Sequence, residues 1–207
     1  MKIYIIGDSI SIHYGPYLER LLRGTIEYSR KEGEEEALLD LDHPQGANGG
    51  DSSMVLSFLR ARMPDGRIGT DLMLINCGLH DIKTDPVSGT KQVPLQQYEK
   101  NLREIVKVVT NTGIPMVWIR TTPCDEAVHN PPGGSGVLRF KADCAAYNAA
   151  ADGIMKNAGV PCIDLHGFTA NLGPELYCDH VHFVEPVREK QAAFIAGWLD
   201  AWMQHAM

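Results

Sequence analysis

Several features that mark large classes of protein are missing from this sequence of 207 residues. It has no excess of positive charge, since its net charge is −7, and this argues against a nucleic-acid partner, which usually needs a basic face. No apolar run approaches the length of a membrane span. The sequence also contains no internal repeat, linker or low-complexity segment. We therefore expect one globular domain over residues 1–207, long enough for a sizeable core.

Two catalytic or metal-binding motifs are absent as well. None of the five cysteines forms a C-x-x-C pair, and their odd number favours reduced structural thiols. No G-x-S-x-G elbow is present, which argues against an ordinary α/β-hydrolase. The cysteines are Cys77, Cys124, Cys144, Cys162 and Cys178.

What the sequence does contain is a regular alternation of short apolar runs and helical patterns. This alternation predicts a mainly parallel sheet with helices on both faces and right-handed crossovers. The segment Glu32–Asp42 stays open between a short helix, an edge strand and a surface insertion, and Thr121–Val137 is a long Pro/Gly-rich loop. The predicted strands are Ile3–Ile6, Thr25–Ser29, Asp71–Asn76, Pro115–Arg120 and Val160–Asp164. The predicted helices follow Ile10, Ser53 and Pro94, cover Leu138–Ala158, and end with Pro186–His205.

The first strand leads directly into Gly7-Asp8-Ser9 and a helix. Ser9 therefore lies where a strand ends and a helix begins, the edge at which open α/β sheets bind ligands. Helix amides and the helix dipole favour negative charge there, so a serine at this position suits a nucleophile. The alternative interpretation is a simple Asp/Ser helix cap.

Three further stretches are predicted to meet Ser9 at this edge. They are Asn48-Gly49-Gly50-Asp51, Gly78-Leu79-His80-Asp81 and Asp179-His180-Val181-His182. Acyl transfer needs a base to activate the serine, and His182 can serve, with Asp179 fixing its tautomer. The amides of Ser9 and Gly50 and the ring N–H of His80 can donate to the oxyanion.

These four blocks resemble those of the SGNH (GDSL-like) hydrolases, in the same order and over nearly the whole chain. The resemblance implies a three-layer α/β/α sandwich with a five-stranded sheet of flavodoxin-like order. It also implies Ser9, His182 and Asp179 as the catalytic triad and Ser9, Gly50 and His80 as the oxyanion donors. His80 departs from the family pattern, which has asparagine at this position. Imidazole keeps one donor but titrates near neutrality, and a loop histidine bonded to a backbone carbonyl is the other interpretation.

A metal site is the main competing interpretation of the histidines. Gly78-Leu79-His80-Asp81 looks like the G-N-H-[DE] block of metallophosphoesterases, but the early D-x-H of that family is missing. We therefore expect no metal and no cofactor. Of the neighbours, we expect His180 to be an exposed bystander and Asp81 to be a cap or a loop anchor.

The resemblance implies an ester hydrolase acting through an acyl-serine intermediate on a small-molecule or carbohydrate ester. We favour acetyl esters of a carbohydrate, because the loops Thr84–Val93 and Thr121–Val137 are polar and no segment looks like a hydrophobic lid. A lysophospholipase or thioesterase and a non-catalytic carbohydrate-binding protein remain the alternatives, and a homo-oligomer stays open. Because a strand begins at Lys2, we expect a cytoplasmic chain, although a secreted or periplasmic chain trimmed of its signal peptide would look the same.

Overall fold

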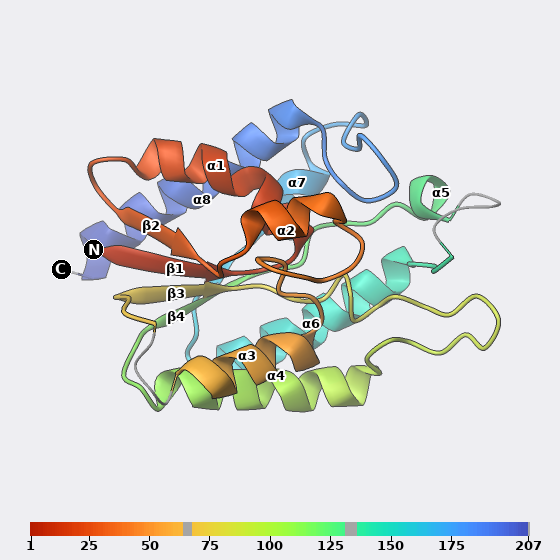
Figure 1. Ribbon diagram of the computed structural model, residues 1–207, viewed down its shortest axis with the longest axis horizontal. Coiled ribbons are helices and arrows are strands. Elements are labelled where there is room, and N and C mark those ends of the chain that lie inside the picture. The colour runs from red at the N-terminus through yellow and green to blue at the C-terminus, as the bar shows by residue number, and fades with distance from the viewer. Residues whose placement is uncertain (64–67, 131–135, 207) are drawn as a thin grey trace.

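A computed structural model describes residues 1–63, 68–130 and 136–206, and it shows a sheet between two layers of helices (Figure 1). The strand order is β2-β1-β3-β4-β5, and each neighbouring pair is parallel. In Figure 1, α1, α7 and α8 lie above the sheet, and α3, α4 and α6 lie below it. The predicted three-layer α/β/α sandwich with a flavodoxin-like strand order is confirmed.

The structure has five strands and eight helices in the described residues. The strands are β1 (Lys2–Ile6), β2 (Glu27–Arg30), β3 (Leu72–Ile75), β4 (Met116–Ile119) and β5 (Cys162–Ile163). The helices are α1 (Ser9–Leu22), α2 (Glu34–Leu39), α3 (Ser52–Arg62), α4 (Leu95–Thr110), α5 (Glu126–His129), α6 (Lys141–Asn157), α7 (Leu165–Ala170) and α8 (Glu185–Ala206).

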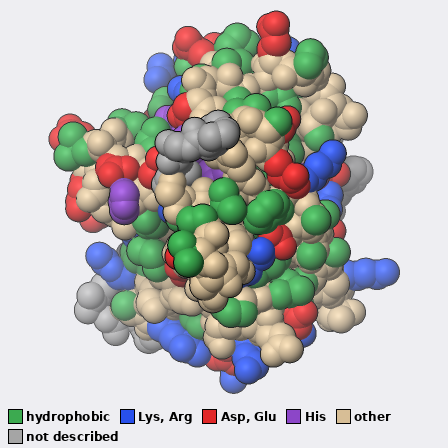
Figure 2. All heavy atoms as spheres, turned by 90° about the vertical axis from the view of Figure 1, so that its right-hand side faces the viewer, with side chains coloured by type: hydrophobic (Ala, Val, Ile, Leu, Met, Phe, Trp, Pro, Cys, Tyr) green, Lys and Arg blue, Asp and Glu red, His purple; other side chains and the backbone are tan. Residues whose placement is uncertain are grey.

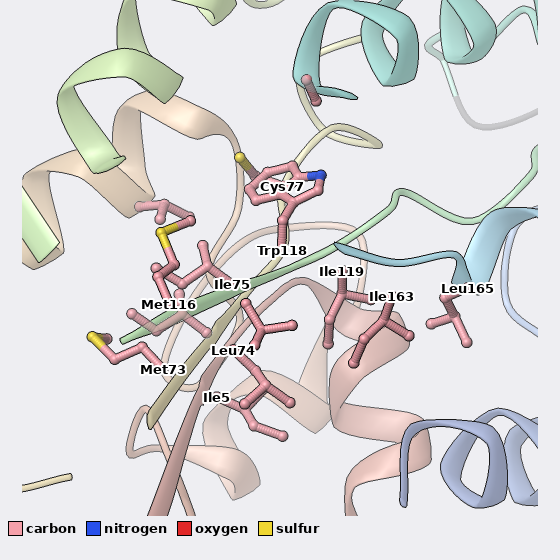
Figure 3. Packing of buried hydrophobic residues seen from close by; sticks show 14 of the residues in the cluster. Ile5, Met73, Leu74, Ile75, Cys77, Met116, Trp118, Ile119, Ile163 and Leu165 are labelled. Atoms are coloured by element: carbon pink, nitrogen blue, oxygen red, sulfur yellow. The ribbon is translucent and has the colours of Figure 1, made fainter. Parts of the chain in front are cut away.

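The central strands are apolar on both faces because both faces are covered by helices. All residues of β3 and β4 are buried, and their side chains pack with those of β1 and β5 in one cluster (Figure 3). A parallel strand buried on both sides needs this continuous apolar run. None of the helices in the described part of the chain is long and apolar enough to cross a membrane.

Three local predictions differ from the structure or are sharpened by it, and one helix is missing from the predictions. Strand β2 starts at Glu27, two residues later than predicted, because the amides of Thr25 and Ile26 bond to the Leu22 carbonyl and close the end of α1. The open segment Glu32–Asp42 forms the short helix α2. The loop Thr121–Val137 contains the single turn α5, and its residues 131–135 lie outside the described residues. Helix α7 was not predicted.

The carboxyl ends of all five strands meet at one edge of the sheet, because every pair is parallel. This edge is on the right in Figure 1, where the loops that follow β1, β3 and β4 lie. Figure 2 looks onto this edge and shows acidic and histidine side chains together on the lobe at its left. The four blocks singled out from the sequence converge here.

Candidate active site

Ser9 lies at the junction between β1 and α1, where the sequence predicts it. The side chain of Asp8 caps the helix by accepting a hydrogen bond from the Ile10 amide at 3.0 Å. As the first residue of α1, Ser9 has no intrahelical acceptor for its own amide. Gly7 is required in front of it, because a Cβ at this position would lie 2.8 Å from the Cβ of Ser11. The junction therefore has both a helix cap and a helix amide without an intrahelical acceptor.

Ser9, His182 and Asp179 form a hydrogen-bonded chain. The Oγ of Ser9 lies 2.8 Å from Nε2 of His182, and Nδ1 of His182 lies 2.8 Å from Oδ2 of Asp179. Since a carboxylate only accepts, His182 carries its proton on Nδ1 and presents Nε2 as the acceptor for the serine hydroxyl. The structure thus brings together three residues that are 173 and three positions apart in the chain.

The carboxylate of Asp179 is held in place by its own loop. Its Oδ1 accepts hydrogen bonds from the amides of Val181 and His182 at 2.8 and 2.7 Å. Partial burial raises the pKa of Asp179, but these amide bonds and the neighbouring His182 outweigh burial, so the pKa lies below its ordinary value. The group is therefore ionised at neutral pH and can orient and stabilise a protonated His182.

The loop that carries His182 is closed like a small hairpin. Tyr177 and Phe183 form a β-bridge and stack with ring centroids 5.1 Å apart. The amide of Cys178 donates to the His182 carbonyl at 2.9 Å. His182 is only 2% exposed, so its ring orientation is determined by its packing as well as by Asp179.

Gly50 lies in the loop that packs against the Ser9 junction, but its amide is already engaged. The neighbouring Gly49 amide donates to the Gly7 carbonyl at 2.8 Å and ties this loop to the Ser9 junction. Gly50 has a φ of +69°, which favours glycine, and its amide donates to Oδ1 of Asn48 at 3.0 Å. The role of Gly50 as an oxyanion donor stays a prediction, and an oxyanion would have to compete with the Asn48 side chain for this amide. Asn48, for which the sequence suggested no role, is fully buried.

His80 follows β3 in a buried turn and is only 2% exposed. Burial, together with the charges of Lys83 and Arg139, holds the pKa of His80 well below its ordinary value, so the ring is neutral. Its Nδ1 is buried and has no hydrogen-bond partner among the residues that the structure describes. A proton on Nδ1 would have no acceptor, and this favours the tautomer that carries the proton on Nε2. The ring therefore retains one N–H donor.

The two aspartates beside these donors act as anchors. Both carboxylate oxygens of Asp81 accept from the Ser52 amide at 3.0 Å, and burial raises the pKa of Asp81 to about 8. Asp51 caps α3 by accepting from the amides of Ser53 and Met54. The anchor interpretation of Asp81 agrees with this geometry, since it ties the His80 turn to the start of α3.

His180 is not the exposed bystander that we expected from the sequence. Its side chain is 22% exposed, with Nε2 at 3.0 Å from Oδ2 of Asp42 and Nδ1 at 2.9 Å from Nδ1 of His129. The prediction was wrong because the partners come from distant segments, and no local pattern in the sequence signals them. In the described ranges, no group of three or more His, Cys, Asp or Glu side chains is arranged to hold a metal ion.

Comparison with known proteins identifies the family of the chain. Residues 5–185 match the family described as the GDSL-like Lipase/Acylhydrolase family, which is more than half of the chain. The chain belongs to the GDSL-like lipase/acylhydrolase family. No curated protein sequence matches the chain.

Solved structures of GDSL-like and related enzymes share the fold. A lipase/acylhydrolase from Enterococcus faecalis matches with a TM-score of 0.71 and 16% identity, over 97% of this chain and 95% of that chain. An acetyl xylan esterase matches with a TM-score of 0.68 and 16% identity, over 95% and 98% of the two chains. An acetylxylan esterase from Geobacillus stearothermophilus matches with a TM-score of 0.64 and 17% identity, over 94% and 91%. At these identities the likeness establishes the fold alone.

Proposed function

We propose that the protein is a serine ester hydrolase that acts through an acyl-enzyme on acetyl or other short-chain esters of a carbohydrate. The observation that carries this proposal is the chain of two 2.8 Å hydrogen bonds from Ser9 through His182 to Asp179. This arrangement is the one that activates a serine hydroxyl at neutral pH. No cofactor or metal takes part in the proposed reaction.

In the acylation step, the Oγ of Ser9 attacks the ester carbonyl carbon while its proton passes to Nε2 of His182. Asp179 stabilises the resulting imidazolium, since it is ionised and bonded to Nδ1. The amides of Ser9 and Gly50 and the ring N–H of His80 donate to the carbonyl oxygen as it becomes negative. The intermediate collapses, the C–O bond to the alcohol breaks, and His182 returns the proton to the leaving oxygen.

In the deacylation step, water replaces the alcohol. His182 takes a proton from the water as it attacks the acyl carbon, and then protonates Ser9 as the carboxylic acid leaves. The base and the acid are the same imidazole in both steps, so one hydrogen-bonded chain is sufficient for the whole cycle.

The preference for a small acyl group on a polar alcohol rests on two observations. The face that carries the site mixes hydrophobic with charged and other polar atoms, and shows no broad hydrophobic surface in Figure 2. Two of the structures that share the fold are described as acetyl xylan esterases. A lysophospholipase or thioesterase would need an apolar channel for a long acyl chain.

The test is a series of p-nitrophenyl esters of increasing chain length, assayed with and without a chelator, for the parent protein and for Ser9→Ala. We expect the highest turnover on the acetate, no effect of the chelator, and loss of turnover in a folded Ser9→Ala variant. A fluorophosphonate should label Ser9 in the parent protein. Label on another serine, or turnover in Ser9→Ala equal to the parent, would contradict the mechanism.

A second measurement separates the substrate classes. Release of acetate from an acetylated oligosaccharide should exceed release of fatty acid from a lysophospholipid by a wide margin. If fatty acid is released faster than acetate, the substrate is a lipid ester and not a carbohydrate ester. Binding of the oligosaccharide without turnover would favour a non-catalytic carbohydrate-binding protein.

A further inference from the structure

Four side chains form a continuous chain of contacts beside the triad. They come from four separate segments that meet at the carboxyl edge of the sheet: Asp42 after α2, His180 in the triad loop, His129 at the end of α5, and Arg139 before α6. Nε2 of His180 lies 3.0 Å from Asp42, its Nδ1 lies 2.9 Å from Nδ1 of His129, and Nε2 of His129 lies 3.1 Å from Nη1 of Arg139. Of these four residues, only His180 belongs to one of the four family blocks.

One assignment of protons satisfies all three contacts. Nη1 of Arg139 lies 3.1 Å from Nε2 and 3.3 Å from Nδ1 of His129, so this contact alone does not choose the acceptor. The backbone carbonyl of His180 lies 3.2 Å from Nδ1 of His129 and only accepts, which places the His129 proton on Nδ1 and leaves Nε2 as the acceptor. His129 then carries its proton on Nδ1 and donates to Nδ1 of His180. His180 in turn carries its proton on Nε2 and donates to the carboxylate of Asp42. Both imidazoles are neutral in this arrangement, and every donor in the chain points the same way.

The charges at the two ends of this hydrogen-bonded chain support the direction of donation, from Arg139 toward Asp42. Arg139 is 2% exposed, and no carboxylate lies within ion-pair distance of it in the parts of the chain that the structure describes. A buried cation without an ion-pair partner is costly, and hydrogen bonds to neutral acceptors offset only part of that cost. Burial and the charge of Arg139 lower the pKa of His129 to about 4, which keeps the ring neutral as the assignment requires. The chain therefore runs from a buried cation to a carboxylate at the surface.

Both ends of the chain are bonded to the loops of the proposed oxyanion donors. The Nε of Arg139 donates to the carbonyl of Leu79 at 2.7 Å, directly before His80. At the other end, Lys83 Nζ donates to the Asp42 carbonyl at 2.8 Å. The same segment reaches the Gly50 loop, because the side-chain amide of Asn48 donates to the neighbouring Leu41 carbonyl.

The middle of the chain lies against the triad. The ring of His180 is edge-on to the ring of His182, with centroids 6.0 Å apart, and only one residue separates them in sequence. The amides of Val181 and His182, which follow His180, hold the Asp179 carboxylate. A shift of His180 would therefore move the base and the residue that orients it together.

We propose that the side chains of Asp42, His180, His129 and Arg139 form a positioning network that holds the triad loop in register with the turns carrying Gly50 and His80. These are positioning residues: they act through His182 and the oxyanion donors and touch no reacting atom. The proposal rests on the proposed ester hydrolysis at Ser9. Its chemical effect is to keep the nucleophile, base and donors within the narrow geometry that acyl transfer needs.

A control for the experiment lies on the same segment of the protein as Asp42. Asp40 and His43 form a second Asp–His pair, 2.7 Å apart, on the same segment as Asp42. The side chain of His43 is 82% exposed, and the ring makes no contact with the triad loop in the described residues. Oδ1 of Asp40 also accepts from the amide of Asp42 at 3.0 Å, so only His43 serves as the control. Substitution of His43 reports on the general tolerance of the segment.

The experiment measures kcat and KM on p-nitrophenyl acetate, with the melting temperature as a check on folding. The variants are His180→Ala, Asp42→Ala, Asp42→Asn and the double variant of Asp42→Ala with His180→Ala, and the control is His43→Ala. For His180→Ala we expect kcat about 10- to 100-fold lower, with KM within about twofold, because misplacement affects the chemical step. Asp42→Ala should lower kcat less, and Asp42→Asn, which retains an acceptor for His180, should recover part of that loss.

The double variant distinguishes a network from separate effects. If the residues act as one unit, it should be no slower than His180→Ala alone, whereas independent effects would multiply. The proposal would be overturned by effects that multiply, by kcat values within about twofold of the His43→Ala control, or by a rise in KM with kcat unchanged. If His180→Ala does not fold, the comparison of Asp42→Ala with His43→Ala decides. Full turnover in Ser9→Ala would instead refute the proposed function, so the two failures are distinguishable.

Discussion

At the scale of single residues, the most informative position is His80, where the family has asparagine. A side-chain amide donates without regard to pH, whereas an imidazole donates reliably only when its tautomer is determined by its surroundings. Here burial and the nearby cations keep the ring neutral, and the unpartnered Nδ1 favours the proton on Nε2. If His80 is the oxyanion donor, its donation depends on the surroundings of the ring.

If His80 donates to the oxyanion, His80→Ala should lower kcat by about 100- to 1000-fold, on the order of 2.7–4 kcal/mol, with KM nearly unchanged. The charge appears only in the transition state, which is why substrate affinity should be spared. His80→Asn provides the usual family donor at a shorter reach and should recover part of the loss. Steady-state kinetics on an acetate ester test this, and full activity in both variants would show that His80 is only a loop residue.

At the scale of elements, the start of α3 matters more than its length suggests. The helix begins at Ser52, two residues after Gly50, so its cap also determines where the Gly50 loop ends. Asp51 accepts from two helix amides and from the side-chain amide of Gln92 at 2.8 Å, while Asp81 holds the Ser52 amide. A helix cap and a proposed oxyanion loop are here one piece of structure.

Asp51→Ala should therefore lower the free energy of unfolding by about 1 kcal/mol, within the usual range of roughly 0.5–2 kcal/mol for a lost cap. It should also lower turnover, because the Gly50 loop loses its anchor. Denaturation in urea and an esterase assay measure the two effects. Asp125→Ala is the matched control for stability alone, since Asp125 caps the single turn α5, and it should cost less stability. It is no control for turnover, because α5 carries His129. An equal loss of unfolding free energy in Asp51→Ala and Asp125→Ala would argue against this account of α3.

At the scale of the whole molecule, buried histidines link stability to pH. Burial, with smaller contributions from the charges of Arg188 and His182, lowers the pKa of His13 from 6.5 to about 4. His129 is lowered to about 4 as well, chiefly by burial. Between pH 4 and 6.5 these rings stay neutral in the folded protein and become protonated in the unfolded chain. The unfolded state then binds more protons, so stability rises with pH across this window and falls on acidification.

We expect the melting temperature to fall between about pH 7 and about pH 5, and the fall to be smaller in His13→Gln, which has no proton to bind in either state. Calorimetry at the two pH values measures this, and His43→Gln at the exposed surface is the control that should keep the parent's pH dependence. A fall of the same size in His13→Gln and in the parent protein would show that His13 contributes nothing to it.

The sequence by itself determined what depends on neighbouring residues. The two-sided apolar runs predicted the parallel sheet, and Gly7-Asp8-Ser9 after the first run predicted a serine at a strand-to-helix junction. The spacing of Asp179 and His182 predicted that one would orient the other, because three residues of a tight loop bring the two side chains together. Helix α7 had a local signal that we did not use, the cap in which Asp164 accepts from the Gly167 amide.

Only the tertiary structure decided what depends on long-range contacts. His180 contacts Asp42 across 138 positions and His129 across 51, and no pattern in the sequence specifies such pairs. The engagement of the Gly50 amide by Asn48 depends on the backbone conformation of one loop, which composition does not reveal. The proposed catalytic groups lie on elements that the hydrophobic pattern dictates, whereas their supporting contacts arise where loops from four segments pack together, and that packing is set by the fold as a whole.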